Sequence, residues 1–343
     1  MTEQKRILLI YTGGTIGMKQ NPKTGALEAF DFEHLAKAVP ELERFNTDIY
    51  TLQFSPPIDS SDMSPEKWVE LSQIIVSNYD AYDGFVVLHG TDTMAYTASA
   101  LSFMLENLDK PVVLTGSQLP IGQLRTDGKE NLITAIEIAM AKHEDGSAVV
   151  PEVCIYFSGR LLRGNRTTKR DCDYFNAFDS YNFPPLAQAG CDISYRHDLI
   201  LHHPHAALAP HYSYNPNVVV FSLFPGIQER LVRHVFEMPD LKGVVMRSFG
   251  SGNAPHKPWL LDCMSMAAKR DVTIVNITQC ATGSVCMNRY EAGLQLLNCG
   301  VISGHDSTVE AAVTKLMFLL GQYRDAAIVR QLMGQSLCGE ITV

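Results

Sequence analysis

Two threonines stand in tight, glycine-rich turns, and each turn directly follows an apolar run of the sequence. The first turn spans residues 12–15 with the sequence TGGT and holds Thr15, and the second spans residues 89–93 with the sequence HGTDT and holds Thr91. An alcohol becomes a useful nucleophile at neutral pH only when a positioned base takes its proton. Glycine allows the backbone to turn sharply and to approach a ligand closely. We therefore expect the two hydroxyls at the floor of a catalytic site.

Other interpretations of these turns stay open at this point. Thr15 and Thr91 could each cap the amino terminus of a helix, because a hydroxyl there accepts from backbone N–H groups. The pair Gly13 and Gly14 could cradle an anion such as phosphate, since the start of a helix attracts negative charge. The alternative to an enzyme is therefore a non-catalytic α/β module that binds an anion or an amino acid.

A base and a carboxylate are available to act on these hydroxyls. Lys169 follows a strand-like run within the basic segment 163–170. A lysine becomes a useful base only when burial or a cationic neighbour lowers its pKa, and Arg166 and Arg170 are such neighbours in the sequence. The same segment also fits an exposed basic loop. Asp92, in the second turn, fits either a helix cap or a carboxylate that binds an ammonium group or orients the lysine.

The elements that must position these residues follow a clear pattern. Apolar runs alternate with helical patterns, which is typical of a parallel sheet covered by helices. We expect strands at residues 7–11, 48–54, 85–88, 112–115 and 153–157 and helices at residues 65–78, 95–106 and 131–141. Ser64 and Pro65 mark the start of the first helix, as its cap and in its first turn. Both threonine turns then follow carboxyl ends of parallel strands, where open α/β sheets bind ligands.

The chain is long enough for two domains. Residues 1–195 are predicted to form a larger, N-terminal catalytic α/β domain, and residues 218–343 a smaller C-terminal α/β domain. The stretch 196–217 lacks periodicity and is interpreted as a linker. The expected elements of the second domain are strands at 218–223, 243–247 and 273–277 and helices at 228–236, 259–269 and 307–320. The histidine-rich run 202–205 lacks cysteine or carboxylate partners at metal-ligand spacing, so we interpret it as a solvated part of the linker.

Composition narrows the choice of partner and compartment. The 343 residues are 46% hydrophobic and 19% charged, and the net charge of −9 disfavours nucleic acid and anionic membrane surfaces as partners. The eight cysteines are irregularly spaced without a C-x-x-C pair, so we expect reduced, mostly buried thiols and no metal site. The apolar run near the amino terminus is too short for a secretory signal or a membrane span, which predicts a cytoplasmic protein.

Taken together, the motifs resemble those of the type I bacterial L-asparaginases. Residues 11–17 (YTGGTIG) match the first signature of that family, and residues 88–93 (LHGTDT) match the second. Further matching segments follow in the family's order at residues 59–63, 115–118, 163–169, 247–250 and 278–280. The resemblance spans nearly the whole chain, and the combination is far more specific than any single motif.

This resemblance implies hydrolysis of L-asparagine to L-aspartate and ammonia through an acyl-threonine intermediate. It implies Thr15 as the nucleophile and a second triad of Thr91, Asp92 and Lys169, in which the lysine helps to activate a hydroxyl or the water that releases the acyl group. The implied substrate-binding residues are Thr91, Asp92 at the α-ammonium, Asp59, Ser60 and Ser61 around the α-carboxylate, and Ser117 and Gln118.

The chemistry itself requires stabilisation of an oxyanion, which paired N–H groups in the turns of Thr15 and Thr91 could supply. It requires no metal and no organic cofactor. Ser60 and Ser61 also fit ordinary turn chemistry before the first predicted helix. Within the enzyme class, glutamine or another small amide stays open as the main substrate.

One departure from the family concerns a tyrosine. Many relatives carry one on the mobile loop after the first motif, whereas residues 18–30 contain none. Tyr290 matches a tyrosine that the type I branch keeps in its second domain, and it could reach the site from a neighbouring subunit. The alternative for Tyr290 is a core or interface tyrosine with a hydrogen-bonded hydroxyl.

The type I branch also has a second asparagine site between subunits of a tetramer, through which asparagine activates the enzyme. The matching residues in this sequence are Thr168, Arg247, Asn253, Thr278 and Cys280. A planar, permanently charged guanidinium at the end of an apolar run suits an α-carboxylate. The alternative is a structural arginine paired with an acid at a subunit interface. The resemblance thus implies self-association, as a homodimer or a homotetramer.

Overall fold

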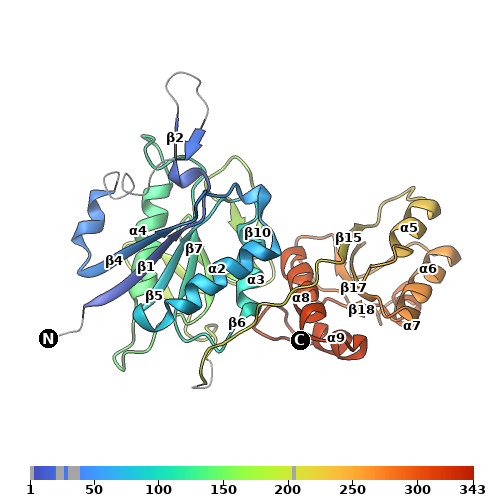
Figure 1. The fold of residues 1–343 in the computed structure, drawn as a ribbon. Helices are drawn as coiled ribbons and strands as arrows, with labels where there is room; N and C mark the ends of the chain where they lie inside the picture. Colours follow the sequence, from blue (N-terminus) through green and yellow to red (C-terminus); the bar gives the residue numbers. More distant parts are fainter. Residues whose placement is uncertain (1–3, 21–26, 30–38, 203–205) are drawn as a thin grey trace. The chain divides into compact units, whose positions relative to one another are not determined.

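The computed structural model describes residues 4–20, 27–29, 39–202 and 206–343. The chain divides into two compact units, Met1–Tyr212 and Ser213–Val343 (Figure 1). Each unit is a sheet with helices on its faces, and the sheet of the first unit is the larger one. The predicted two-part α/β fold is therefore confirmed. No helix among the described residues is long and apolar enough to cross a membrane.

The first unit is built on an eight-stranded sheet in the order β13-β12-β9-β8-β7-β5-β1-β4. Its strands are β1 Lys5–Tyr11, β4 Thr47–Gln53, β5 Gly84–Leu88, β7 Val112–Thr115, β8 Val153–Phe157, β9 Arg160–Arg163, β12 Ala187–Ala189 and β13 Ile193–Tyr195. The run from β4 to β8 is parallel, and the pairings β8–β9, β9–β12 and β12–β13 are antiparallel. The five parallel strands are the ones that the apolar runs predict.

The sequence does not predict the three antiparallel strands. β9 begins directly after Ser158 and Gly159, whose positive φ values of 49° and 78° reverse the chain so that β9 runs back along β8. β12 and β13 have three residues each, which is too short for an alternating pattern to be recognised.

Helices cover both faces of this sheet. They are α2 Pro65–Ser77, α3 Met94–Met104 and α4 Gly128–Met140. α4 packs on the face to which Leu9, Val86 and Val113 point, and these residues share one hydrophobic core with Leu132 and Ile136 of the helix. α2 and α3 pack against each other on the other face, and α3 contacts β8 (Figure 1).

The register of the strands brings four loops to one edge of the sheet. Tyr11 lies opposite Gln53 on one side and Leu88 on the other, and Leu88 lies opposite Thr115. The chain passes from β1 to β4 on one side and then returns past β1 to β5 on the other side. This is the kind of switch point at which open α/β sheets bind ligands.

The turns after β1 and β5 pack backbone against backbone. A Cβ on Gly14, whose φ is +94°, would lie 2.5 Å from Cα of Gly90. A Cβ on Gly13, whose φ is +141°, would lie 2.0 Å from the carbonyl oxygen of Ile58 in the loop after β4. No side chain fits at these two positions, so the glycines are required by the packing of three loops.

The second unit holds a four-stranded parallel sheet in the order β15-β16-β17-β18. Its elements are β15 Val218–Ser222, α5 Glu229–Phe236, β16 Gly243–Ser248, α6 Pro258–Lys269, β17 Thr273–Thr278, α7 Glu291–Asn298, β18 Ile302–Ser303, α8 Val309–Gln322 and α9 Ala326–Met333. One core joins the sheet to α5, α6 and α7, and α8 and α9 lie on the other face (Figure 1). The sequence predicts all of these except β18, α7 and α9, and β18 has only two residues.

Short elements complete the described chain. They are η1 Thr15–Gly17, β2 Met18–Gln20, β3 Leu27–Ala29, η2 Pro40–Arg44, η3 Ser60–Asp62, η4 Tyr79–Ala81, β6 Leu105–Glu106, η5 Gly164–Arg166, β10 Thr168–Lys169, β11 Phe178–Asp179 and β14 Ala209–Pro210. β14 lies in the stretch that the sequence suggests as a linker, and it pairs with β6 of the first unit.

The structure tests the predictions made for the cysteines and for the histidine-rich run. All eight cysteines are free, but only Cys154 and Cys263 are buried, so the expectation of mostly buried thiols is wrong. The other six lie in turns, loops or helix ends, where the core does not cover them. Residues 203–205 of the histidine-rich run lie outside the described residues. Among the described residues, no group of three or more His, Cys, Asp or Glu is placed to hold a metal ion.

Gly14→Ala is expected to lower the free energy of unfolding by about 3 kcal/mol, because both the positive φ and the backbone of Gly90 oppose a Cβ. Gly146→Ala is the matched control. Its φ is +84°, but nothing lies within 4 Å of the added Cβ, so the cost should be about 1 kcal/mol. Urea denaturation of both variants measures the difference. Equal losses would contradict the packing of the two turns.

Candidate active site

Lys169 contacts both candidate groups of the second turn. Its Nζ donates to Thr91 Oγ1 at 2.9 Å and to Asp92 Oδ1 at 2.6 Å. The side chain of Lys169 is 18% exposed, whereas that of Asp92 is 65% exposed. The structure thus brings together the three residues that the resemblance implies as a triad, with an ion pair beside a hydroxyl.

The segment around the lysine is not an exposed basic loop. β10, which carries Lys169, pairs with β11, and Arg170 Nη1 donates to Asp179 Oδ2 at 2.8 Å. Arg166 is 3% exposed, and its guanidinium lies 5.1 Å from the ring centroid of Phe183. Both arginines therefore have other partners, and the charged group in contact with the lysine is a carboxylate.

A buried ion pair holds the start of this segment. Arg163 Nε donates to Glu152 Oε2 at 2.7 Å, and the two side chains are 4% and 3% exposed. Arg163 also donates to the carbonyl of Leu199 at 2.7 Å, and Glu152 accepts from the N–H of Leu201 at 2.6 Å. Loss of one partner would leave an unpaired buried charge, so removal of either Arg163 or Glu152 should destabilise the start of this segment.

Thr15 is the first residue of η1, and the residue in the cap position is Gly14. The interpretation of Thr15 as a helix cap is therefore wrong. Thr12 N–H donates to the carbonyl of Leu88 at 3.0 Å, which ties the first turn to the strand that leads into the second turn. The Thr15 hydroxyl makes no hydrogen bond to any described residue.

The capping interpretation also fails in the second turn. The cap position of α3 is occupied by Thr93, not by Thr91 or Asp92. The Thr93 hydroxyl donates instead to the carbonyl of Ser60 at 2.6 Å, which joins the second turn to the loop after β4. Thr91 and Asp92 are therefore left free for the contacts with the lysine.

Asp59 caps a tight turn beside the second motif. Its Oδ1 accepts from the backbone N–H of Ser61 at 2.9 Å and from the Ser61 hydroxyl at 2.8 Å. These hydrogen bonds hold the pKa of Asp59 below its ordinary value. Ser60 is buried, and a Cβ on Gly90 would lie 2.5 Å from its Oγ. The turn chemistry is present, and it places the two serines next to the second turn.

Gln118 reaches Thr91 from the loop after β7. Thr91 Oγ1 donates to Gln118 Oε1 at 3.4 Å. The Gln118 backbone N–H donates to both oxygens of Asp127 at 3.1 and 3.0 Å. The hydroxyl of Ser117 donates to the carbonyl of Leu119 at 2.5 Å. Nothing in the sequence marks Asp127 as the residue that holds this loop.

The set matched to the second asparagine site lies in both units. Arg247, Asn253, Thr278 and Cys280 are at or just after the carboxyl ends of β16 and β17, whereas Thr168 is in β10 of the first unit. Thr278 Oγ1 accepts from the N–H of Cys280 at 3.0 Å. The Nε atom of Arg247 is buried and has no hydrogen-bond partner among the described residues.

Tyr290 lies in the second unit, in the cap position of α7. Its side chain is 49% exposed, and the guanidinium of Arg289 lies 5.6 Å from its ring centroid. The interpretation as a core tyrosine is therefore wrong. In the loop that lacks a tyrosine, residues 21–26 and 30 lie outside the described residues.

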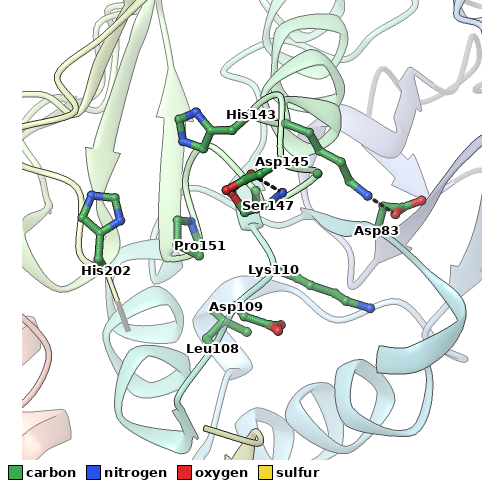
Figure 2. A pocket seen from close by; sticks show the side chains of 12 residues that line it. Asp83, Leu108, Asp109, Lys110, His143, Asp145, Ser147, Pro151 and His202 are labelled. Carbon is green, nitrogen blue, oxygen red and sulfur yellow. Dashed lines mark hydrogen bonds and ion pairs between the residues drawn. The ribbon is translucent and has the colours of Figure 1, made fainter. Parts of the chain in front are cut away.

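A cavity of about 490 Å³ lies in the first unit at the amino ends of the parallel strands, opposite the end that carries the two threonine turns (Figure 2). Asp83, Lys110 and Pro151 line it, and they precede the amino ends of β5, β7 and β8. Its charged groups have partners, because Lys142 pairs with Asp83 and Lys110 donates to two backbone carbonyls. No candidate catalytic residue lines this cavity.

His89, the first residue of the second turn, is buried in a chain of hydrogen bonds. Its Nε2 lies 2.9 Å from Thr97 Oγ1, which accepts from Trp68 Nε1 at 3.1 Å, and its Nδ1 lies 2.7 Å from the carbonyl oxygen of Gly90. Because a carbonyl oxygen only accepts, Nδ1 carries the proton of the neutral ring, and Nε2 accepts from the Thr97 hydroxyl. Burial lowers the pKa of His89 from 6.5 to about 4. The ring is neutral at pH 7.

This buried imidazole predicts a pH dependence of stability. Between pH 6.5 and about 4 the unfolded chain binds a proton at His89 that the folded chain does not. The contribution to stability is full above pH 6.5 and is lost as the pH falls through about 4, a loss of about 3 kcal/mol. His89→Leu should flatten the dependence of the unfolding free energy on pH in this window, measured by urea denaturation at pH 7 and pH 4.5. An unchanged slope, equal to that of the surface control His256→Leu, would contradict a buried neutral His89.

Comparison with known proteins covers both units. Residues 6–201 match the family model "Asparaginase, N-terminal" and residues 217–333 match "Glutaminase/Asparaginase C-terminal domain". L-asparaginase 1 of Escherichia coli K12 is 43% identical over 341 residues, 99% of each chain. L-asparaginase I of Vibrio cholerae has a crystal structure that matches with a TM-score of 0.89 at 40% identity, over 99% of this chain and 100% of that one. The thermostable L-asparaginase of Thermococcus kodakarensis matches with a TM-score of 0.90 at 35% identity, over 98% and 99% of the two chains.

These matches agree in both sequence and fold, and each of the three relatives is covered over nearly its whole length. The chain therefore belongs to the asparaginase family of amidohydrolases.

Proposed function

We propose that this protein hydrolyses L-asparagine to L-aspartate and ammonia, with Thr15 as the nucleophile. The observation that carries the proposal is the contact of Lys169 with Thr91 and Asp92, in a chain that is similar to L-asparaginase 1 over nearly its full length. A threonine, a lysine and a carboxylate at one sheet edge are the groups that acyl transfer from an amide needs.

In the first half of the reaction Thr15 Oγ attacks the carbon of the substrate amide. A C–O bond forms while the carbonyl π electrons move onto oxygen, and the hydroxyl proton passes through the site to the leaving nitrogen. When the carbonyl forms again, the C–N bond breaks and ammonia leaves. Thr15 then carries the aspartyl group as an ester, without a metal or an organic cofactor.

In the second half a water molecule attacks this ester, and L-aspartate leaves as a proton returns to Thr15 Oγ. We assign the transfer of protons to Thr91 and Lys169, which are 2.9 Å apart between Oγ1 and Nζ. Asp92 holds the lysine in place through its Oδ1. Coupled groups of this kind fail together when one is removed.

The substrate is oriented by its charged ends. The second carboxylate oxygen of Asp92 has no partner among the described residues, and the side chain is mostly exposed, so it is available for the α-ammonium. We assign the α-carboxylate to the turn of Ser60 and Ser61. The N–H and the hydroxyl of Ser61 donate to Asp59, so the donors that this turn offers the carboxylate are the N–H and the hydroxyl of Ser60. Asp59 is itself negative, so its part is to hold Ser61 in the turn.

The purified protein should release ammonia from L-asparagine, with glutamine as the comparison amide. Thr15→Ala and Thr91→Val should each lower kcat at least about 1,000-fold. Lys169→Arg keeps the charge but cannot give up a proton, so it should lower kcat about 100-fold. The control Thr51→Ala removes an exposed hydroxyl from β4 and should leave kcat unchanged.

Each result of this experiment decides one assignment. Normal turnover by Thr15→Ala would overturn Thr15 as the nucleophile, and if only Thr91 proved essential the two roles would be exchanged. Faster turnover of glutamine would make the enzyme a glutaminase. A wild-type protein that binds asparagine without releasing ammonia would be the non-catalytic binding module.

We also propose that asparagine binds a second, activating site that includes Arg247, Asn253, Thr278 and Cys280. The buried, unpartnered Nε of Arg247 supports this proposal, because a buried donor needs an acceptor and a carboxylate suits a guanidinium. Thr168 belongs to the same set and directly precedes Lys169. An effector changes the rate only if it favours a state with different affinity or activity, which we place in a dimer or tetramer of this chain.

If this proposal is right, the initial rate rises sigmoidally with asparagine concentration. Arg247→Ala should give a hyperbolic curve while keeping turnover at saturation, because it removes the effector's carboxylate partner but no catalytic group. Arg230→Ala, an exposed arginine of α5, is the matched control and should stay sigmoidal. A hyperbolic wild-type curve with one asparagine bound per chain by calorimetry would exclude the second site.

We further infer that the protein works in the cytoplasm. All eight cysteines are free, and Cys172, Cys191, Cys280 and Cys286 are exposed. Exposed thiols that form no disulfide are typical of a reducing compartment.

A further inference from the structure

We propose that Tyr11 and His89 are positioning residues, because each holds the carbonyl of the glycine that precedes a candidate threonine. Held in this way, the N–H groups of Thr15 and Thr91 are aimed at the carbonyl oxygen of the substrate amide. The inference rests on the proposed function, since it requires an amide to be attacked at this place.

The side chain of Tyr11 contacts the backbone of the first turn. It is the last residue of β1 and only 1% exposed, and its hydroxyl donates to the carbonyl of Gly14 at 3.4 Å. The same carbonyl accepts from the N–H of Gly17 at 3.2 Å. Gly17 makes room for the ring, because a Cβ there would lie 2.3 Å from Tyr11 Cζ. Burial raises the pKa of Tyr11 to about 12, so the phenol stays a donor.

His89 does the same in the second turn. Its Nδ1–H donates to the carbonyl of Gly90 at 2.7 Å. The hydrogen bond from Thr97 to Nε2 and the donation from Trp68 to Thr97 hold the ring in one orientation and one tautomer. Both turns therefore have a buried aromatic donor on the glycine carbonyl, although one donor is a phenol and the other an imidazole.

The direction of the threonine N–H groups follows from peptide geometry. In a trans peptide unit the N–H points away from the C=O, and the carbonyls of Gly14 and Gly90 share their units with the N–H groups of Thr15 and Thr91. When the carbonyls face the buried donors, the N–H groups face the opposite way. Neither N–H makes a hydrogen bond within the described part of the chain.

The two N–H groups come from turns that touch at Gly14 and Gly90. As Thr15 Oγ adds to the amide carbon, negative charge develops on the carbonyl oxygen. Donors that are already oriented stabilise this charge more than they stabilise the neutral amide. Such donors raise kcat and leave the binding of the ground state nearly unchanged.

The test compares Tyr11→Phe and His89→Leu with Tyr156→Phe in the assay of ammonia release. Tyr156 is a fully buried tyrosine of β8 whose hydroxyl binds Glu130, so its variant also loses a buried phenol. Tyr11→Phe and His89→Leu should each lower kcat about tenfold with KM changed by less than about twofold. Tyr156→Phe should keep the wild-type kcat. Thermal unfolding at pH 7 shows whether each variant is folded.

The outcomes separate this inference from the proposed function. Wild-type kcat in both Tyr11→Phe and His89→Leu, with Thr15→Ala inactive, would overturn the positioning role alone. An equal loss of kcat in Tyr156→Phe would also overturn it, because the effect would then be one of general packing. If only one of Tyr11→Phe and His89→Leu folds, its kcat and KM test the positioning role in the turn that it contacts. Activity in Thr15→Ala would instead remove the proposed function, whatever the other variants do.

Discussion

The close approach of two backbones, at Gly14 and Gly90, is the constraint on which the candidate site depends. A Cβ on Gly14 would lie 2.5 Å from two backbone atoms of Gly90, so the turns after β1 and β5 touch without any side chain between them. This contact is possible because Tyr11 and Leu88 are in register at the ends of adjacent parallel strands. Because the two strands end at the same register position and each is followed by a glycine turn, the hydroxyls of Thr15 and Thr91 lie at the same end of the sheet.

The remaining parts of the site are brought to this area from the neighbouring strands. The loop after β4 supplies Ser60, which packs on Gly90, and the loop after β7 supplies Gln118, which contacts Thr91. Lys169 is different, because it lies in β10, which follows the antiparallel strand β9. The buried pair of Arg163 with Glu152 holds the start of the segment between β9 and β10.

The candidate site has charged groups on its exposed side and neutral hydrogen-bond donors in its buried part. The ion pair of Lys169 with Asp92 faces solvent on the side of Asp92, so it is open to a charged substrate. Behind the turns the donors are neutral: the phenol of Tyr11 keeps its proton and the imidazole of His89 stays uncharged because burial disfavours the charged form. Charges thus lie where a zwitterionic ligand would be bound, and neutral groups lie where the backbone must be held.

The five parallel strands and the two threonine turns can be predicted from local sequence alone, because a strand buried on both faces is continuously apolar and a sharp turn requires glycine. Both signals are local. The sequence also indicated Lys169 and Asp92 through the order of motifs, but not the contact between them. The partners of His89, Arg163 and Gln118 depend on the tertiary fold, as do the contacts of Arg170 with Asp179 and of Arg166 with Phe183. These side chains meet residues far away in the sequence, and such meetings depend on strand register and on the reversal into β9, neither of which leaves a periodic signal in the chain.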